Sequence, residues 1–234
     1  MKVIILAGGL GTRISEETVD KPKPMVLLND KPILWHIMSI YSQQGFTEFI
    51  VATGYKGQMI SDWVANLDTD WRILAVDTGI KTQTGGRIKS CMDLFPGERV
   101  LVTYGDGVGN INITQLLEFH EAHGKLATLT AVRPPARFGY LDIDHGRVAH
   151  FGEKNQTNAG WINGGFFVLE PEVTDCIKSM SEPFETGALP KLAGDGELMA
   201  FEHGGFWQPM DTLREKQDLE KLAYEGNPPW LIGI

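Results

Sequence analysis

Short apolar runs alternate with amphipathic stretches through the first 135 residues of the chain. Residues 3–6 are rich in β-branched side chains and stop at Gly8 and Gly9, which is typical of a buried strand that leads into a tight loop. Residues 32–44 carry isoleucines at helical spacing, and Gly45 follows them as a stop signal. The same reasoning predicts further strands at 48–53, 71–76, 99–104 and 126–132, and further helices at 57–67, 86–95 and 113–123.

The pattern changes after Pro134 and Pro135, where shorter strands are expected. Alternation of strands and helices requires right-handed crossovers and a mostly parallel sheet. We therefore expect one α/β domain over residues 1–234, with a Rossmann-like, doubly wound, mixed but mostly parallel sheet that the second half extends or caps. The elements predicted in that half are strands at 140–143, 147–152 and 165–169 and helices at 171–180 and 213–224.

Composition narrows the class of protein. Hydrophobic residues make up 42% of the 234 residues, which is enough to build a core of this size. The net charge of −9 disfavours a nucleic-acid partner, and no apolar run approaches the roughly 20 residues that cross a bilayer. Cys91 and Cys176 are far apart and match no zinc or disulfide spacing. Because no signal-type cleavage region follows the first apolar run, we expect a cytoplasmic protein without a membrane partner.

The glycine loop at residues 8–13 is the first candidate for chemistry. Ligands of an open parallel sheet lie beyond the carboxyl ends of its strands, and this loop follows the first strand. Its glycines let the backbone approach an anion, and Arg13 adds a planar cation. No Lys-Ser/Thr pair follows, as a P-loop needs, and Ile14 stands where a dinucleotide fingerprint has its third glycine. The pattern indicates phosphate binding, with a tight turn as the alternative.

Three charged residues extend this candidate site. Lys23 lies between two prolines that restrict its backbone, so it is a candidate for charge neutralisation, or else part of a solvated turn. Asp106 lies between two glycines after an apolar strand, where a carboxylate can reach Mg²⁺. Asp211 precedes a predicted helix, and its spacing alone favours a helix N-cap.

Polar residues of the second half suit a polyhydroxylated ligand, although each also fits a turn. Glu153 and Lys154 end a predicted strand, and Asn163 precedes a glycine pair. His120 and His123 lack the glutamate of a helical zinc motif, so we expect them at the surface.

Motifs along nearly the whole chain resemble those of the sugar-1-phosphate nucleotidylyltransferases, and in particular of members that use CTP and glucose 1-phosphate. They are LAGGLGTR, SEET, KPKPM, KPILWHIM, TGGR, TYGDGV, HGKLATLTAVRPPARFG, INGGFFVL and GELMAFEHGGFWQPMDTLR.

The resemblance implies a fold, a reaction and an assembly. The fold is the nucleotidyltransferase fold with a small sugar-binding extension; residues 1–135 form the nucleotide half, and residues 136–234 form the sugar-phosphate half with the last helices. The reaction is Mg²⁺-dependent transfer of a cytidylyl group from CTP to a sugar 1-phosphate, which gives a CDP-sugar and pyrophosphate. A homo-oligomer is implied as well.

The resemblance also assigns residues. It places Leu6, Ala7, Gly8, Gly9, Gly11, Thr12, Arg13, Lys23, Thr82, Gly86, Arg87, Gly105 and Asp106 on the nucleotide. It places Tyr104, Gly139, Glu153, Lys154, Asn163 and Gly164 on the sugar phosphate. The implied catalytic residues are Arg13, Lys23, Asp106 and Asp211, with Asp106 and Asp211 as the ligands of Mg²⁺.

The sequence departs from the family pattern in two places. The segment between Asn66 and Asp77 is shorter, and a glutamate-lysine-proline motif reads Glu153, Lys154, Asn155. Another sugar phosphate, and UTP or dTTP in place of CTP, are therefore kept as alternatives. A non-catalytic nucleotide-sugar sensor is a separate alternative, which would be expected to lack some of the acids and cations that this sequence retains.

Overall fold

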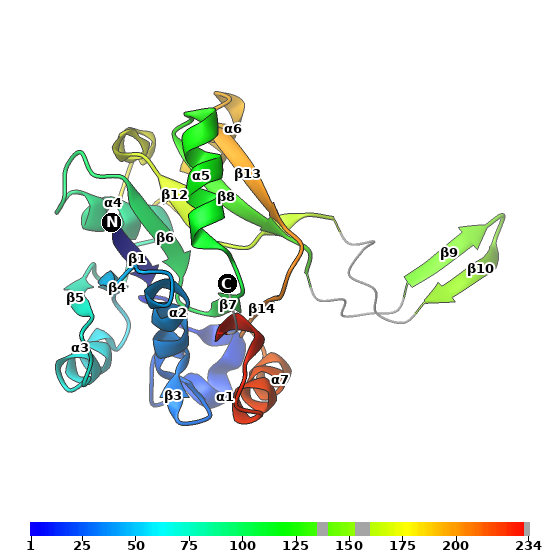
Figure 1. Cartoon of the computed structure of the whole chain (residues 1–234), viewed down its shortest axis with the longest axis horizontal. Helices are drawn as coiled ribbons and strands as arrows, with labels where there is room; N and C mark the ends of the chain where they lie inside the picture. Colours follow the sequence, from blue (N-terminus) through cyan, green and yellow to red (C-terminus); the bar gives the residue numbers. More distant parts are fainter. Residues whose placement is uncertain (135–139, 153–159, 232–234) are drawn as a thin grey trace.

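The computed structural model describes residues 1–134, 140–152 and 160–231, and its centre is an eight-stranded sheet (Figure 1). The strands of this sheet are β1 (Lys2–Leu6), β4 (Glu48–Thr53), β5 (Arg72–Asp77), β6 (Val100–Tyr104), β8 (Ala127–Val132), β11 (Ile162–Asn163), β12 (Phe167–Leu169) and β13 (Leu198–His203).

The strand order is β5-β4-β1-β6-β12-β8, and β13 pairs with β8 in parallel. Only β11 and β12 run antiparallel to their neighbours in this sheet. The expected mixed, mostly parallel α/β fold is confirmed. Leu6 lies opposite both Ala52 and Tyr104, so the loops after β1, β4 and β6 leave the sheet at one edge.

Apolar side chains cover both faces of the sheet, as a doubly wound fold requires. Val3 and Ile5 belong to one buried cluster, whereas Ile4 and Leu6 belong to the other, because successive side chains of a strand point to opposite faces. The helices that cover the sheet and its ends are α1 (Ser15–Thr18), α2 (Ile33–Ser42), α3 (Gly57–Ala65), α4 (Thr84–Met92), α5 (Ile113–His123), α6 (Ala188–Gly194) and α7 (Leu213–Tyr224).

Three two-stranded ribbons complete the described chain. They are β2 (Leu27–Leu28) with β3 (Lys31–Pro32), β7 (Gly107–Gly109) with β14 (Trp207–Pro209), and β9 (Tyr140–Asp144) with β10 (Arg147–Gly152). The β9–β10 ribbon stands apart from the body in Figure 1. The β7–β14 ribbon matters most for the site, because it brings the segment before α7 beside the loop that follows β6.

In the second half the structure differs from one predicted helix and contains elements that were not predicted. The helix predicted at 171–180 is a 3₁₀ segment, Pro171–Cys176, in which the Thr174 hydroxyl donates to the Pro171 carbonyl. The helix α6 and the strand β13 were not predicted, since β13 is a half-exposed edge strand with weak alternation.

His120 was expected at the surface, and this prediction was wrong. Its side chain is 1% exposed, and its ring nitrogens face the Thr128 hydroxyl at 2.8 Å and the Glu170 carboxylate at 3.1 Å. Helical spacing could not reveal these two partners, since both lie on neighbouring strands or their ends.

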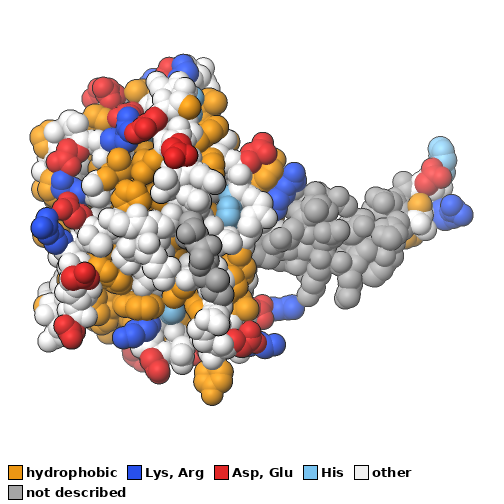
Figure 2. Space-filling model, viewed as in Figure 1, with side chains coloured by type: hydrophobic (Ala, Val, Ile, Leu, Met, Phe, Trp, Pro, Cys, Tyr) orange, Lys and Arg blue, Asp and Glu red, His pale blue; other side chains and the backbone are white. Residues whose placement is uncertain are grey.

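The described helices include none that is long and apolar enough to cross a bilayer. On the face shown in Figure 2, acidic and basic side chains are interspersed over the body of the molecule. This face therefore presents no single basic stripe.

Candidate active site

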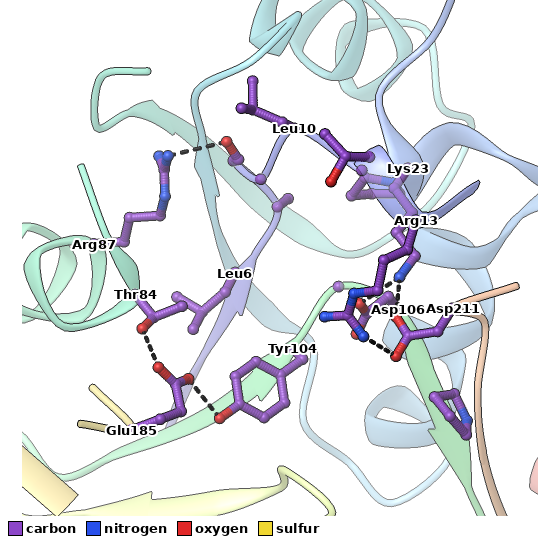
Figure 3. Close-up of a pocket in the computed structure, with 18 of the residues that line it drawn as sticks. Leu6, Leu10, Arg13, Lys23, Thr84, Arg87, Tyr104, Asp106, Glu185 and Asp211 are labelled. Atoms are coloured by element: carbon purple, nitrogen blue, oxygen red, sulfur yellow. Dashed lines mark hydrogen bonds and ion pairs between the residues drawn. The ribbon is translucent and has the colours of Figure 1, made fainter. Parts of the chain in front are cut away.

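A cavity of about 1140 Å³ opens at the carboxyl edge of β1 and β6 (Figure 3). Most of the predicted site residues line it. Those that do are Leu6, Ala7, Gly8, Gly9, Gly11, Thr12, Arg13, Lys23, Thr82, Arg87, Tyr104, Gly105, Asp106, Asn163 and Asp211.

Five predicted residues are not among those that line the cavity. Gly139, Glu153 and Lys154 lie outside the described residues. Gly86 packs against another segment, and the carbonyl of Gly164 accepts a hydrogen bond from the Trp207 indole at 2.8 Å. A ligand-binding role for these five residues stays a prediction.

The glycine loop presents free backbone donors to the cavity. In the part of the chain that the structure describes, the N–H groups of Gly9, Leu10 and Gly11 donate to no protein acceptor. A Cβ atom on Gly9 would meet nothing within 4 Å, and Gly11 has the left-handed φ of 67° that glycine adopts without strain. Successive unpaired N–H groups of this kind suit an anion.

Arg87 fixes the backbone of the glycine loop through hydrogen bonds to carbonyl oxygens. Its guanidinium donates to the carbonyl oxygens of Gly8 at 2.9 Å and of Thr53 at 2.7 Å. A Cβ atom on Gly8 would lie 2.1 Å from this guanidinium, so only glycine permits the contact. Burial lowers the pKa of Arg87. The structure thus gives Arg87 a positioning role, and its direct contact with nucleotide stays a prediction.

The start of α4 is bound to the protein rather than open to a ligand. The N–H groups of Gln83 and Gly85 donate to the carbonyls of Met180 and Glu182 at 2.9 and 3.1 Å. A Cβ atom on Gly86 would lie 2.3 Å from the Met180 carbonyl oxygen. The two glycines of this helix start therefore allow close packing against residues 180–182.

Four charged side chains meet at the other end of the cavity. The Lys23 ammonium donates to Asp106 Oδ2 and to Asp211 Oδ1, each at 2.7 Å, while Arg13 donates to the second oxygen of Asp211. The Lys23 side chain is 10% exposed, so the alternative of a solvated turn was wrong. The 3₁₀ segment Lys23–Met25, which follows an extended proline, fixes its direction.

The favoured interpretation of Asp211 as a helix N-cap was wrong. Thr212 caps α7 in a reciprocal pair with Glu215, whose carboxylate also accepts the N–H of Asp211 at 2.8 Å. The Asp211 carboxylate is therefore left for Lys23 and Arg13. Spacing could not separate two adjacent residues that both suit a cap.

The two aspartates fit a divalent cation. Both carboxylates reach the same ammonium, so their oxygens are close enough to approach one small ion. Mg²⁺ is commonly bound by one or two carboxylates together with water and substrate phosphates. Among the described residues, no three His, Cys, Asp or Glu side chains are grouped to hold a metal ion. A cation bound here would take its other ligands from substrate or water.

Sequence reasoning missed Glu185 and Thr84, which also line the cavity. The Glu185 carboxylate accepts hydrogen bonds from the Tyr104 hydroxyl at 2.7 Å and from the Thr84 hydroxyl at 2.6 Å (Figure 3). Burial and the charge of Glu185 raise the pKa of Tyr104, which keeps its hydroxyl protonated. No local pattern joins Glu185 to residues so far away in the sequence.

Comparison with known proteins finds a family match and relatives over nearly the whole chain. The nucleotidyl transferase family matches residues 2–213. The chain is 49% identical over 253 residues to a glucose-1-phosphate cytidylyltransferase of Salmonella typhi, with 98% of each chain covered. It is 41% identical over 254 residues to a probable glucose-1-phosphate cytidylyltransferase of Bacillus subtilis, with 99% of this chain and 100% of the relative covered.

Solved structures share the fold. HddC from Yersinia pseudotuberculosis in complex with GMP-PN superimposes with a TM-score of 0.75 at 26% identity, over 94% of this chain and 98% of that one. The glycine loop, the convergent charges, the family match and the full-length relatives lead to one conclusion: the chain belongs to the nucleotidyl transferase family.

Proposed function

We propose that this protein transfers a cytidylyl group from CTP to glucose 1-phosphate, giving CDP-glucose and pyrophosphate. The observation that carries the proposal is the convergence of Lys23, Arg13, Asp106 and Asp211 beside a glycine loop with free N–H groups. Two relatives support the choice of substrates, since they match the chain over nearly its full length. One is named a glucose-1-phosphate cytidylyltransferase, and the other is named a probable glucose-1-phosphate cytidylyltransferase.

The reaction is a displacement at phosphorus. A phosphate oxygen of the sugar 1-phosphate forms a bond to the α-phosphorus of CTP, while the bond from that phosphorus to the β-phosphate oxygen breaks and pyrophosphate leaves with the electron pair. The glycine loop and Arg13 bind the triphosphate, and Lys23 binds the phosphate under attack. Positioning of two reactants supplies on the order of 7–11 kcal/mol of such a barrier, and fixed positive charge lowers it further.

Asp106 and Asp211 would hold the divalent cation, which we propose is Mg²⁺. Bound there, it would neutralise charge on the phosphate oxygens. Lys23 and Arg13 would exchange their carboxylate partners for phosphate partners when the substrates bind. This exchange lets a protein with net charge −9 bind two polyanions, because only the local field at the site has to be positive.

The wider setting is also a proposal. The product would serve deoxysugar or surface polysaccharide synthesis in the cytoplasm, and the enzyme would act as a homo-oligomer. Within a single domain, residues 1–135 would bind the nucleotide and residues 136–234 the sugar phosphate.

A substrate panel tests the proposal. Pyrophosphate release is measured with CTP, UTP, dTTP, ATP and GTP against several sugar 1-phosphates, with and without Mg²⁺. We expect the highest kcat/KM for CTP with glucose 1-phosphate and no turnover after chelation. Faster turnover with another pair would reassign the substrates, and CTP binding without any turnover would identify a sensor.

A further inference from the structure

Four carboxylates line the cavity, and Glu185 differs from the other three. Asp106 and Asp211 bind cationic side chains, and Glu215 closes the cap of α7. Glu185 forms no ion pair with any Lys, Arg or His side chain that the structure describes, and it accepts hydrogen bonds from two neutral hydroxyl groups instead. A carboxylate without a cationic partner is unexpected in a cavity that we propose binds two polyanions, because its charge repels phosphate.

The surrounding hydrogen bonds hold this carboxylate in one orientation. Asn163 donates from Nδ2 to the Tyr104 hydroxyl oxygen at 3.0 Å, so the Tyr104 proton is directed at Glu185. Thr84 accepts the N–H of Phe184 at 2.8 Å, so its proton is directed at Glu185 as well. Each neighbouring donor therefore points toward the carboxylate.

The carboxylate keeps acceptor capacity for a ligand. An ionised carboxylate offers about four acceptor positions, and Tyr104 and Thr84 occupy two of them. Glu185 belongs to the exposed residues and lines the cavity, so the other positions are accessible to a bound molecule. Its negative charge repels phosphate, so among the groups of a sugar 1-phosphate and CTP it can accept only from a neutral hydroxyl or amino donor.

Its place in the fold favours the sugar ring. Tyr104, which anchors Glu185, is two residues from Asp106, where the phosphates meet in the proposed reaction. The hexose is attached directly to the attacking phosphate, whereas cytosine is separated from its phosphate by ribose. Asn163 completes the same hydrogen-bonded chain from β11, on the other side of Tyr104.

We propose that Glu185 is a specificity-determining residue that accepts a hydrogen bond from a ring hydroxyl of the sugar 1-phosphate, with Tyr104, Thr84 and Asn163 as its positioning residues. This inference rests on the proposed function, because it assigns a substrate group within that reaction. It implies that discrimination among sugars depends on a carboxylate outside the charged cluster.

The test pairs Glu185→Gln and Glu185→Ala with Glu172→Gln, which removes an exposed carboxylate that does not line the cavity. For Glu185→Gln we expect kcat/KM for glucose 1-phosphate to fall by about 10- to 100-fold, the range for a hydrogen bond to a charged group. The KM of Glu185→Gln for CTP should stay within about twofold of the KM of the unmodified enzyme. The turnover of the control variant Glu172→Gln should also stay within about twofold of the unmodified enzyme.

A series of 2-, 3-, 4- and 6-deoxyglucose 1-phosphates identifies the hydroxyl. With the unmodified enzyme, kcat/KM should be lower for one analogue than for glucose 1-phosphate. The loss should be about as large as the loss that Glu185→Gln causes with glucose 1-phosphate. With that analogue, Glu185→Gln and the unmodified enzyme should have equal kcat/KM. A merely structural role would lower activity with every analogue to the same extent, and that result would overturn the inference. If a variant does not fold, the unmodified enzyme alone still tests the inference. The inference would be overturned if none of the four analogues lowered kcat/KM to this extent.

Nucleotide analogues test whether Glu185 instead accepts a hydrogen bond from a ribose hydroxyl or from the cytosine amino group of CTP. If the penalty of Glu185→Gln vanishes with 2′-deoxy-CTP, 3′-deoxy-CTP or UTP instead, Glu185 contacts ribose or base, and the sugar assignment is wrong. Failure of the proposed function is distinct, because it is seen with the unmodified enzyme as absent turnover of CTP and glucose 1-phosphate. In that event, calorimetric binding of glucose 1-phosphate to the unmodified protein and to Glu185→Gln decides the inference, and equal affinities would refute it.

Discussion

The two edges of the central sheet carry the same kinds of charged and polar residue in different arrangements. At the carboxyl edge, Lys23 lies between Asp106 and Asp211 beside backbone donors that have no described partner. At the amino edge, Arg99 and His120 both donate to Glu170, which follows β12. The first arrangement can change partners when a ligand arrives, and the second is complete without one.

The amino edge forms a directed chain of hydrogen bonds. The N–H of Lys125 donates to His123 Nδ1 at 2.9 Å, which assigns the ring proton to Nε2 and directs it at the Thr128 hydroxyl at 2.8 Å. Thr128 then donates to His120 Nδ1, and His120 Nε2 donates to Glu170. Because each group in this chain has a partner, the region contributes to stability and offers no free group to a substrate.

From this difference we infer that hydrogen bonds distinguish a charged cluster that is open to a ligand from one that only stabilises the fold. A closed network stabilises the native state, and breaking it leaves buried groups without partners. An open cluster of exchangeable ion pairs beside unpaired N–H groups is suited to a polyanion. Variants at the two edges should therefore change different quantities.

The largest effect is expected at Lys23. Lys23→Ala removes the positive charge that we propose binds the phosphate under attack, and we expect kcat to fall by about a thousandfold or more with an unchanged circular dichroism spectrum. Asp106→Asn should give a comparable loss. Lys21→Ala is the matched control, because Lys21 belongs to the same motif but does not line the cavity. Turnover of Lys23→Ala close to that of Lys21→Ala would contradict the assignment.

The next effect is expected at Glu170 and in stability. Glu170→Ala leaves the buried His120 and the Arg99 guanidinium without their shared acceptor, and we expect the free energy of unfolding to drop by about 2 kcal/mol. For a chain of this length the melting temperature should fall by about 4–8 °C, while kcat at 25 °C is retained. Glu121→Ala removes the exposed partner of Arg99 and should cost less than about 0.5 kcal/mol. A loss of turnover without a loss of stability would place Glu170 with the functional groups.

The smallest effect is a pH dependence. Burial lowers the pKa of His120 below the 6.5 of an unfolded chain, so the unfolded state binds more protons below that pH. This histidine therefore lowers the stability of the folded state as the pH falls below 6.5, and it has no such effect well above that pH. His120→Gln keeps a donor for Glu170 but does not titrate, so the decrease in stability between pH 6.5 and 5.5 should be smaller in this variant than in the unmodified protein.

Denaturant titrations at several pH values measure this slope. The exposed His145, replaced by asparagine, serves as the control for removing a histidine from the surface. An identical slope in His120→Gln and in the unmodified protein would show that this histidine is not the source.

Local sequence patterns predicted most strands of the sheet and the part of the site that the first half of the chain supplies. Residues 3–6, 48–53 and 99–104 each contain a short run of consecutive apolar residues, and the structure confirms strands there with ends that shift by one residue at most. The glycine loop, Lys23 and Asp106 were predicted because glycine and proline reveal backbone needs in the sequence itself.

Other parts of the site were beyond local reasoning. The position of Asp211 depends on the β7–β14 ribbon, which joins segments about a hundred residues apart. Glu185 depends on a hydrogen bond to Tyr104 across 81 positions. Neither contact leaves a periodicity or a spacing in the sequence.

The sequence by itself therefore determined the alternation of strands and helices, the glycine loop, and the acids and cations that could act beside it, since backbone preference and hydrophobic period act over a few residues. The tertiary structure decided which charges meet. It placed Asp211 on Lys23, directed Arg87 behind the glycine loop, buried His120 against Glu170, and brought Glu185 to Tyr104. These choices depend on how distant segments pack and which polar atoms are left to pair, and only the folded chain fixes both.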